Sequence, residues 1–294
     1  MCNAVKPTST RPLPKPDGTA INALLSVAAC AIRTRARDQF GIYLSAVAGI
    51  NAQLVVLGLA GLGTAGLAQA QTPPPLAPFF DAGSTQLNPA WRLTGLPGKQ
   101  AAPLARFESY PLNGNTALLL ATNKSYGALT HAWPAATPAP AELAWRWRLE
   151  QALAQPDLAT KGGDDAAIKV CVMFDQPLTD IPFFQRAALS LARAATGQDI
   201  PNATLCYIWD SRYPAGTQGA NPYSARVRYM VLNGVETPTG QWVNQRRRIA
   251  DDFLKMYGTE SATVPAVIAI AVGADSDNTG GQSLAYLAAL RWLP

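Results

Sequence analysis

The 294-residue sequence has few of the residue types on which hydrolytic enzymes depend. It contains a single histidine, His131, and no Gly-x-Ser-x-Gly segment. A serine or cysteine triad would need that histidine as its general base, and the turn that exposes the nucleophile of many hydrolases is missing. His131 also lies close to Trp133 at the end of an expected strand. We therefore expect a packing or surface role for His131, which disfavours nucleophilic hydrolysis.

Cysteine is also scarce, with four in the chain and no Cys-x-x-Cys pair. The missing pair argues against thioredoxin-like chemistry and against a zinc cluster. Cys171 and Cys206 are the two that follow residue 70, and each lies within an expected strand. They would form a disulfide if those strands are neighbours in an oxidising compartment, and would otherwise be buried free thiols. The sequence leaves both alternatives open.

The first 70 residues differ from the rest of the chain. A long N-terminal extension with arginines near its end leads into an apolar run, Phe40 to Leu67, and then into Ala68-Gln69-Ala70. A basic flank, an apolar segment and a small-x-small triplet are typical of a signal peptide, here cleaved after Ala70. An uncleaved membrane anchor is the alternative. We expect a periplasmic or secreted protein with no membrane span after cleavage, and a proline-rich linker at residues 71–78.

The excess of basic residues belongs largely to this leader. Residues 1–70 carry six of the 24 basic and two of the 19 acidic side chains, which leaves 18 against 17 in the mature chain. Binding of nucleic acid would need a basic stripe on the folded domain. The one locally basic segment is residues 245–248, and on a strand its arginines alternate between faces. The sequence therefore predicts a solvated edge strand and no nucleic-acid partner.

The clearest secondary-structure pattern lies in residues 143–175. Apolar side chains alternate with Arg146 and Arg148 in residues 143–149, and residues 168–174 alternate in the same way. This period of two is typical of half-buried strands. Such strands need more strands and a second layer to bury their apolar faces. The pattern therefore favours a β-sandwich or a barrel.

The rest of the mature chain has the same character, with short alternating segments and only two segments of helical period. The helices are expected at residues 182–195, laid over a sheet edge or barrel end, and at residues 249–257. The spacing predicts one all-β domain over residues 79–294, a jelly-roll-like sandwich with one or two short helices. The further strands are expected at residues 106–112, 116–123, 128–133, 204–209, 226–232, 241–247, 264–272 and 283–293.

Two acidic clusters provide candidate ligand-binding groups. Asp164 and Asp165 precede a strand, where carboxylates cap a turn, bind a cation or accept hydrogen bonds from sugar hydroxyls. Asp275, Asp277 and Thr279 follow the long apolar strand in a loop that ends at a glycine. Oxygen ligands at alternate positions are how loops wrap calcium, although the bidentate glutamate of an EF-hand is absent. Calcium at this second loop and plain turn formation are the two alternatives. The two clusters together would supply the carboxylate pair of a glycoside hydrolase only if they face each other across a substrate.

Aromatic and arginine side chains are the second set of candidate ligand-binding groups. Tyr207, Trp209 and Tyr223 flank a glycine-containing loop and are candidates for the aromatic lining of a site for a sugar or an organic ligand. Buried core positions are the alternative for aromatics that alternate with polar residues. Arg146 and Arg148 would lie beside Arg226 and Arg228 if their strands pair, and a cationic face of this kind suits a small anionic ligand.

Several separate motifs, taken in order, resemble a proteobacterial family known as domain of unknown function 3047. The resemblance extends over about residues 79–293 and implies an exported single domain with no established activity. Two segments depart from the pattern of the family: Gln245 replaces an acid, and Ala288 to Leu290 replace an aspartate. By analogy, the jelly-roll fold is similar to galactose-binding-like carbohydrate modules. The motifs are Trp145 to Arg148, Lys161 to Asp165, Tyr207 to Asp210, Asn221 to Tyr223 and Asp275 to Gly280.

From these features we expect a non-catalytic binding domain for a carbohydrate or another ligand of the cell envelope. The acids of both loops would serve as polar anchors, and Tyr207 and Trp209 as aromatic platforms. One alternative is a glycosidase-like hydrolase that uses a carboxylate pair. Another is a structural protein of the envelope that binds a partner. No cofactor other than calcium is indicated.

Overall fold

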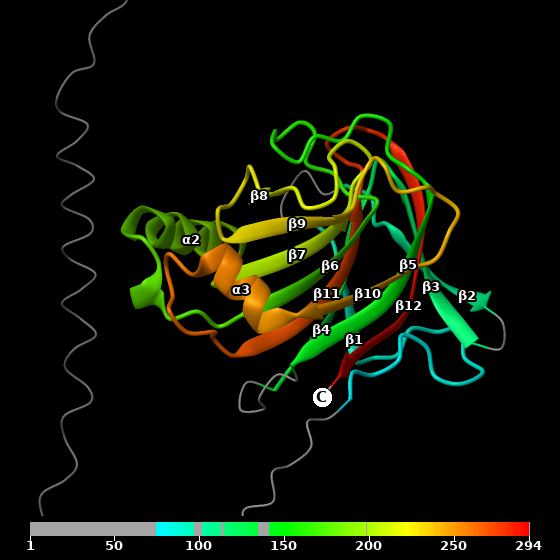
Figure 1. Ribbon diagram of the computed structural model, residues 1–294, viewed down its shortest axis with the longest axis horizontal. Coiled ribbons are helices and arrows are strands. Elements are labelled where there is room, and N and C mark those ends of the chain that lie inside the picture. The colour runs from blue at the N-terminus through cyan, green and yellow to red at the C-terminus, as the bar shows by residue number, and fades with distance from the viewer. Residues whose placement is uncertain (1–74, 97–101, 113–114, 135–140, 198, 294) are drawn as a thin grey trace, which may run out of the picture. The chain divides into compact units, whose positions relative to one another are not determined.

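The computed structural model describes residues 75–96, 102–112, 115–134, 141–197 and 199–293. The expected signal peptide and most of the proline-rich linker lie outside these residues. Within Ala68–Pro294, which forms one unit, the described residues build two β-sheets that pack face to face (Figure 1). The predicted mainly-β, jelly-roll-like sandwich with two short helices is thereby confirmed. Among the described residues, no helix is both long and apolar enough to cross a membrane.

The larger sheet has seven strands. Adjacent strands in this sheet are antiparallel except for β7 and β9, which run parallel. A long connection that contains β8 joins these two strands. Alternation predicted most of these strands, but the short strands β1 and β8 were not predicted. In spatial order they are β1 (Trp91–Thr94), β4 (Tyr126–Ala132), β11 (Val267–Asp275), β6 (Ile168–Phe174), β7 (Ala203–Trp209), β9 (Val227–Asn233) and β8 (Gln218–Ala220).

The smaller sheet has five strands and is antiparallel throughout. The predicted basic edge strand is confirmed, because β10 lies at one end of this sheet. Arg246 and Arg248, which alternate with the inward residues of β10, are exposed. In spatial order the strands are β10 (Val243–Arg248), β5 (Glu142–Gln151), β12 (Gln282–Leu293), β3 (Asn115–Asn123) and β2 (Arg106–Leu112).

Large aromatic side chains fill the space between the two sheets. Trp147 of the smaller sheet packs against Trp209 of the larger sheet, with ring centroids 6.0 Å apart, and Trp145 packs against Tyr207 at 5.4 Å. The Trp147 indole N–H donates to Asn233 Oδ1 at 2.8 Å, so its buried polar atom is satisfied. Rings of this size bury more than 150 Å² each by rough estimate and dominate the energetics of a core.

Two helices complete the domain, and they relate to the core differently. Helix α3 (Ile249–Tyr257) has the bounds expected from the sequence and buries Phe253 against Phe174, with Tyr257 beside it. Helix α2 (Phe183–Thr196) follows the 3₁₀ turn η1 (Leu178–Asp180) and ends at Gly197 in the left-handed conformation. Leu189 alone among its described side chains is buried. Figure 1 shows α2 at one end of the larger sheet, away from the smaller sheet.

Candidate functional site

The structure brings the two acidic clusters of the sequence together at one end of the larger sheet. The loop before β6 carries Asp164 and Asp165, and the loop after β11 carries Asp277 and Asn278. The backbone N–H and the side-chain amide of Asn278 both donate to Asp165 Oδ1 at 3.2 Å, and the N–H of Thr279 donates to Asp165 Oδ2 at 2.6 Å. Asp165 therefore ties the two loops to each other although they are more than a hundred residues apart.

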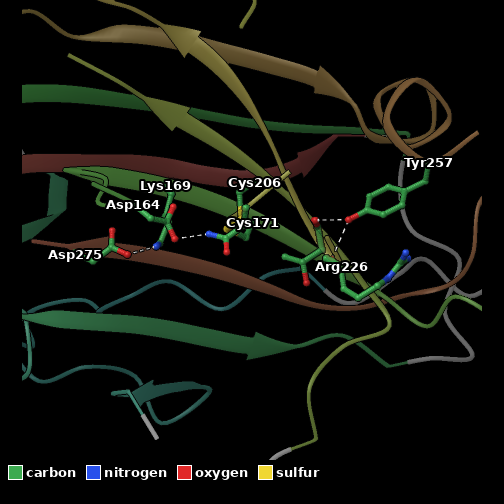
Figure 2. The surroundings of a disulfide bond; sticks show 9 residues. Asp164, Lys169, Cys171, Cys206, Arg226, Tyr257 and Asp275 are labelled. Carbon is green, nitrogen blue, oxygen red and sulfur yellow. Dashed lines mark hydrogen bonds and ion pairs between the residues drawn. A yellow bond between two sulfur atoms is a disulfide. The ribbon is translucent and has the colours of Figure 1, made fainter. Parts of the chain in front are cut away.

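Asp275, the last residue of β11, accepts one hydrogen bond at each of its carboxylate oxygens. Its Oδ1 accepts the N–H of Ala166 at 2.7 Å, and its Oδ2 accepts from the Lys169 ammonium at 2.6 Å. Figure 2 shows Lys169 directed toward Asp164 and Asp275 beside the disulfide. Burial alone would lower the pKa of Lys169, but the charge of Asp275, together with Tyr126 and Asp164, more than offsets it and raises that pKa. Lys169 therefore remains protonated.

Burial raises the pKa of three carboxyl groups of the cluster above the usual range of an aspartate. Burial raises the pKa of Asp164, and Lys169 opposes that rise. Burial also raises the pKa of Asp277, and the negative charge of Asp275 adds to it. The pKa of Asp275 is raised by burial despite its ion pair with Lys169. A site in which crowded carboxyl groups hold their protons more tightly is one that an added cation would stabilise.

The geometry fits a small cation. One carboxylate oxygen each from Asp165, Asp275 and Asp277 lies within 4.8 Å of the others. Asp277 Oδ1 and Thr279 Oγ1 are buried and have no hydrogen-bond partner among the described residues. The carboxylates that already accept hydrogen bonds keep further lone pairs, because each has about four acceptor positions. Two of the three metal ligands predicted from the sequence, Asp275 and Asp277, thus lie together with Asp165 in a group of carboxylates that could hold a metal ion.

The cavity beside these carboxylates is small, about 30 Å³. A volume of this size accepts a water molecule or a single ion, which needs roughly 10–15 Å³ or more, and it is too small for a sugar ring. A glycoside hydrolase needs a substrate between its two carboxyl groups. The cavity is lined on its polar side by Asp164, Asp165, Lys169, Asn221 and Asp275 and on its apolar side by residues that include Cys206, Ile208 and Tyr229.

Tyr223 and Asn221 form the outer edge of the same cluster. The Tyr223 hydroxyl donates to Asn278 Oδ1 at 2.8 Å and to the carbonyl of Lys161 at 3.0 Å, and the Asn221 amide donates to Asp164. The Tyr223 ring is 58% exposed. Of the three aromatic residues predicted to line a ligand site, Tyr223 is the one that a ligand from solution can reach.

The prediction of Tyr207 and Trp209 as aromatic platforms is wrong. They are 0% and 1% exposed, because both point into the space between the sheets. The Tyr207 hydroxyl donates to Asp252 of α3 at 2.8 Å, which satisfies its polar atom inside the core. Strand β7 is central and buried along its whole length, so alternation could not distinguish its outward from its inward residues.

The predicted four-arginine face is also wrong. Arg146 and Arg148 lie on β5 of the smaller sheet, whereas Arg226 and Arg228 belong to the larger sheet. Arg226 and Arg228 both pair with Glu260, and Arg226 is buried. Arg226 and Arg228 therefore belong to an ion-pair network with Glu260. Arg146 and Arg148 point instead to the outer side of the smaller sheet.

On that outer side, a continuous stack of aromatic rings and arginines is formed by residues of three strands, β2, β5 and β12, and by Trp242, which directly precedes β10. The Arg146 guanidinium carbon lies 5.0 Å from the Trp242 ring centroid, and that of Arg148 lies 5.8 Å from Tyr286. Tyr286 also contacts Trp242, at 6.4 Å, and Tyr110, at 4.5 Å. We call these five residues the aromatic–arginine face. Tyr286 is nearly buried at its centre and supports the outer members, Trp242, Arg146 and Tyr110.

Arg146 differs from the other arginines of this sheet face. Arg148 donates to Glu150 at 2.7 Å, and Arg106 donates to Glu108 at 2.8 and 2.9 Å. Arg146 makes no hydrogen bond or ion pair among the described residues, and its Nε is buried. A desolvated N–H without an acceptor is costly, by about 1–3 kcal/mol. Arg146 is therefore a charged group that lacks an anionic partner.

The backbone next to Arg146 is strained. Ala288 pairs with Arg146, and the register then shifts before Arg291, which marks a bulge in β12. Ala289 in that bulge has a φ of 55°, a left-handed conformation that alanine rarely adopts. Such strain costs about 1–3 kcal/mol and concentrates at functional sites. The bulge lies beside the arginine whose guanidinium is unpaired.

The remaining predicted groups have structural roles. His131 Nε2 accepts the N–H of Ala77 at 3.3 Å, and its ring lies 5.1 Å from Trp91, in agreement with the packing role expected for it. Cys171 and Cys206 occupy opposite positions on β6 and β7 and form a disulfide (Figure 2). Sequence reasoning missed Tyr110 and Tyr286 as members of a surface site, since only the strand order places them beside Arg148.

Comparisons with known proteins establish the family of the chain. Among solved structures, one match is the X-ray crystal structure of Trichoderma harzianum endoglucanase 3 from family GH12, at 10% identity. The match covers 70% of this chain and 98% of that chain with a TM-score of 0.32, which carries no functional argument. No curated protein matches the sequence. The model of one family matches residues 89–291, as the motifs predicted, and the chain therefore belongs to the family described as "Protein of unknown function (DUF3047)".

Proposed function

We propose that this domain is a non-catalytic binding module of the cell envelope that takes an acidic glycan on the aromatic–arginine face. The observation that carries the proposal is Arg146, a partly buried guanidinium with no partner among the described residues. The charge of Arg146 calls for an anion, and its planar fork suits a carboxylate in particular. Because Trp242 fixes the guanidinium from one side, little conformational entropy is lost when a carboxylate binds.

A sugar that carries a carboxylate matches both the unpaired guanidinium and the aromatic rings of this surface. Exposed rings offer flat apolar area at low entropic cost, which suits the apolar face of a sugar ring. Trp242 and Tyr110 supply such area on either side of Tyr286. An open sheet face also suits an extended polymer better than a small molecule, which usually binds in a concave pocket.

A binding role is favoured over hydrolysis because the acids of this face are engaged. Glu108 and Glu150 are each held by an arginine on their own strand. The hydrogen bond from Arg106 lowers the pKa of Glu108, so this carboxyl group is poorly suited to act as a general acid. The disulfide supports export into an oxidising compartment, in line with the signal peptide expected from the sequence.

Isothermal titration calorimetry with oligosaccharides of equal length tests the proposal. We expect an oligogalacturonate to bind and a neutral galactan oligosaccharide to bind at least about tenfold more weakly, because an ion pair to a guanidinium is worth about 1.5–3 kcal/mol. The affinity for the acidic ligand should fall as salt is added, since an exposed ion pair is screened. Equal affinity for the two oligosaccharides, or no binding of either, would contradict an acidic-glycan function.

For the loop cluster we propose calcium, in a stabilising role separate from glycan binding. The unpartnered Asp277 Oδ1 and Thr279 Oγ1, together with the close carboxylates of Asp165 and Asp275, support this. An ion held there would bind the native state and neutralise carboxyl groups whose pKa is raised by burial. It would link the loop before β6 to the loop after β11 in addition to the hydrogen bonds of Asp165.

Thermal unfolding in calcium and in EDTA measures this effect. Calcium should raise the midpoint, with a gain of about 2.7 kcal/mol at a hundredfold excess over Kd. Asp277→Asn should remove the response to calcium, because it deletes a charge from the donor set. Asp251→Asn is the matched control, since Asp251 is an exposed acid of α3 outside the cluster. A midpoint that is the same in calcium and in EDTA would refute the calcium proposal.

A further inference from the structure

Helix α2 directs its apolar side chains toward solvent. Phe183, Phe184 and Leu191 are 66%, 84% and 72% exposed. The sequence predicted a helix here with one apolar stripe laid over the sheet, and the helix is confirmed but the stripe faces outward. Four of the eleven exposed large hydrophobic residues in the described part of the chain lie within residues 178–191. Clustering of this kind marks an interaction site, whereas apolar residues exposed singly do not.

The exposed residues form one sector of the helix. With about 100° between successive residues, the sector spans roughly 140° of the helix circumference. The opposite side holds the attachment to the domain: Leu189 is buried, Gln185 accepts from Arg226 at 2.8 Å, and Arg193 donates to Asn202 at 2.8 Å. The outward apolar sector is made of Phe183, Phe184, Ala187, Ala188, Leu191, Ala194 and Ala195, all of them exposed.

A groove adjoins this sector. Its volume is about 360 Å³, and it lies between α2 and the segment before β9. Ala188, Leu189, Ala192, Ile200 and Val227 line it, and Phe184 stands at its edge. The volume falls within the range of sites that bury small apolar ligands, about 300–1,000 Å³. An apolar chain that follows Phe184 inward would therefore find room beside the helix.

The charge of the helix indicates the partner. Residues 183–196 contain two arginines, Arg186 and Arg193, and no acidic residue. On the helical wheel Arg186 lies about 60° beyond Phe183, on the near side of the apolar sector. Arg193 lies further round, on the side that attaches to the domain, and its guanidinium is 3.9 Å from Asp199. Aromatic rings flanked by cations are the pattern of helices that lie in the plane of a lipid surface, with the rings among the acyl chains and the cations at anionic headgroups.

We propose that α2 docks the domain on the surface of a bilayer that contains anionic phospholipid, with Phe183, Phe184 and Leu191 inserted and the adjoining groove open to an acyl chain. The helix lies on the membrane and does not cross it. This surface is distinct from the aromatic–arginine face, so membrane docking and glycan binding are independent of each other. Folding of the domain does not depend on membrane docking, because the side chains that would insert are exposed in the free protein.

Hydrogen exchange of the full chain, read by mass spectrometry on peptides from residues 183–196, localises the contact. Vesicles of phosphatidylcholine with phosphatidylglycerol should slow exchange in these peptides at least about tenfold, because docking suppresses local opening of the helix. Vesicles of phosphatidylcholine alone should give less protection. The double substitution Phe183→Ser and Phe184→Ser should abolish protection and leave the thermal midpoint unchanged.

Val235→Ser is the matched control, since Val235 is 60% exposed and lies in the turn after β9. It should leave the protection of α2 intact. Exchange in α2 that is unaffected by anionic vesicles, or that is protected equally by phosphatidylcholine alone, would overturn the proposal. Protection that appears without lipid at high protein concentration and is lost in the double variant would identify a second copy of the chain as the partner, which would also overturn it.

Discussion

Replacing Arg146 with alanine is expected to weaken binding of an acidic oligosaccharide by about 10- to 150-fold. Of the two arginines in the aromatic–arginine face, Arg146 is the one without an acid partner among the described residues, and charged hydrogen bonds of this type contribute about 1.5–3 kcal/mol. Trp242→Ala should have a similar effect, because Trp242 both orients Arg146 and offers its ring to the ligand. Titration calorimetry with oligogalacturonate measures both variants.

Two further variants separate charge from geometry. Arg146→Lys keeps the charge but loses the planar fork and the stacking, so we expect an intermediate loss of affinity. Arg92→Ala removes one positive charge from an exposed position on β1 of the larger sheet and should bind as the native chain does. If Arg92→Ala weakened binding as much as Arg146→Ala, then net charge would explain the binding, and the aromatic–arginine face would not.

Replacing Glu260 with alanine should lower the free energy of unfolding by about 3–5 kcal/mol, because it leaves buried arginines without their counter-charge. Glu260 pairs with Arg226 at 2.6 Å and with Arg228, and the side chains of Glu260 and Arg226 are 7% and 3% exposed. Both guanidinium groups also lie over the ring of Tyr257, at 5.2 and 4.1 Å. Burial raises the pKa of Tyr257 to about 12, so this phenol offers no negative charge in exchange.

Urea denaturation measures this loss, and Asp251→Ala is its control. Asp251 pairs with Arg248 at 3.3 Å, but both side chains are more than half exposed. Ion pairs of that kind contribute about 0–1 kcal/mol. If Glu260→Ala were no more destabilising than Asp251→Ala, the buried network would not hold β9 and the segment before it to α3.

The sequence predicted the strands well, because apolar side chains recur at every second residue of a half-buried strand. Residues 143–149 and 168–174 lie within β5 and β6 almost as expected. Alternation does not say which of two sheets a strand joins, however. The separation of Arg146 from Arg226 depends on strand order, which long-range packing decides. For the same reason Tyr110 and Tyr286 could not be placed beside Arg148.

The errors have a common physical origin. Tyr207 and Trp209 lie on a central strand that is buried on both faces, where alternation carries no information about exposure. In α2 the helical period was correct, but a period only shows that a helix has two different sides. It does not show which side meets the protein, and here the apolar side meets solvent. Each of the two acidic loops was predicted from the sequence as a candidate ligand-binding segment. Only the structure shows that the two loops are in contact through Asp165.

Nuclear magnetic resonance tests the central claim most directly, by following the tryptophan indole N–H signals during titration with oligogalacturonate. We expect the Trp242 signal to move with ligand concentration, while the signals of the buried Trp147 and Trp209 stay in place. The Arg146 Nε–H signal should shift as well, because a carboxylate binds the terminal nitrogens of the same guanidinium. The assignment of the binding face would be contradicted by a ligand that binds without changing the signals of Trp242 and Arg146. Shifts in the backbone amide signals of residues 221–223 and 275–280 would instead place the ligand at the acidic loops.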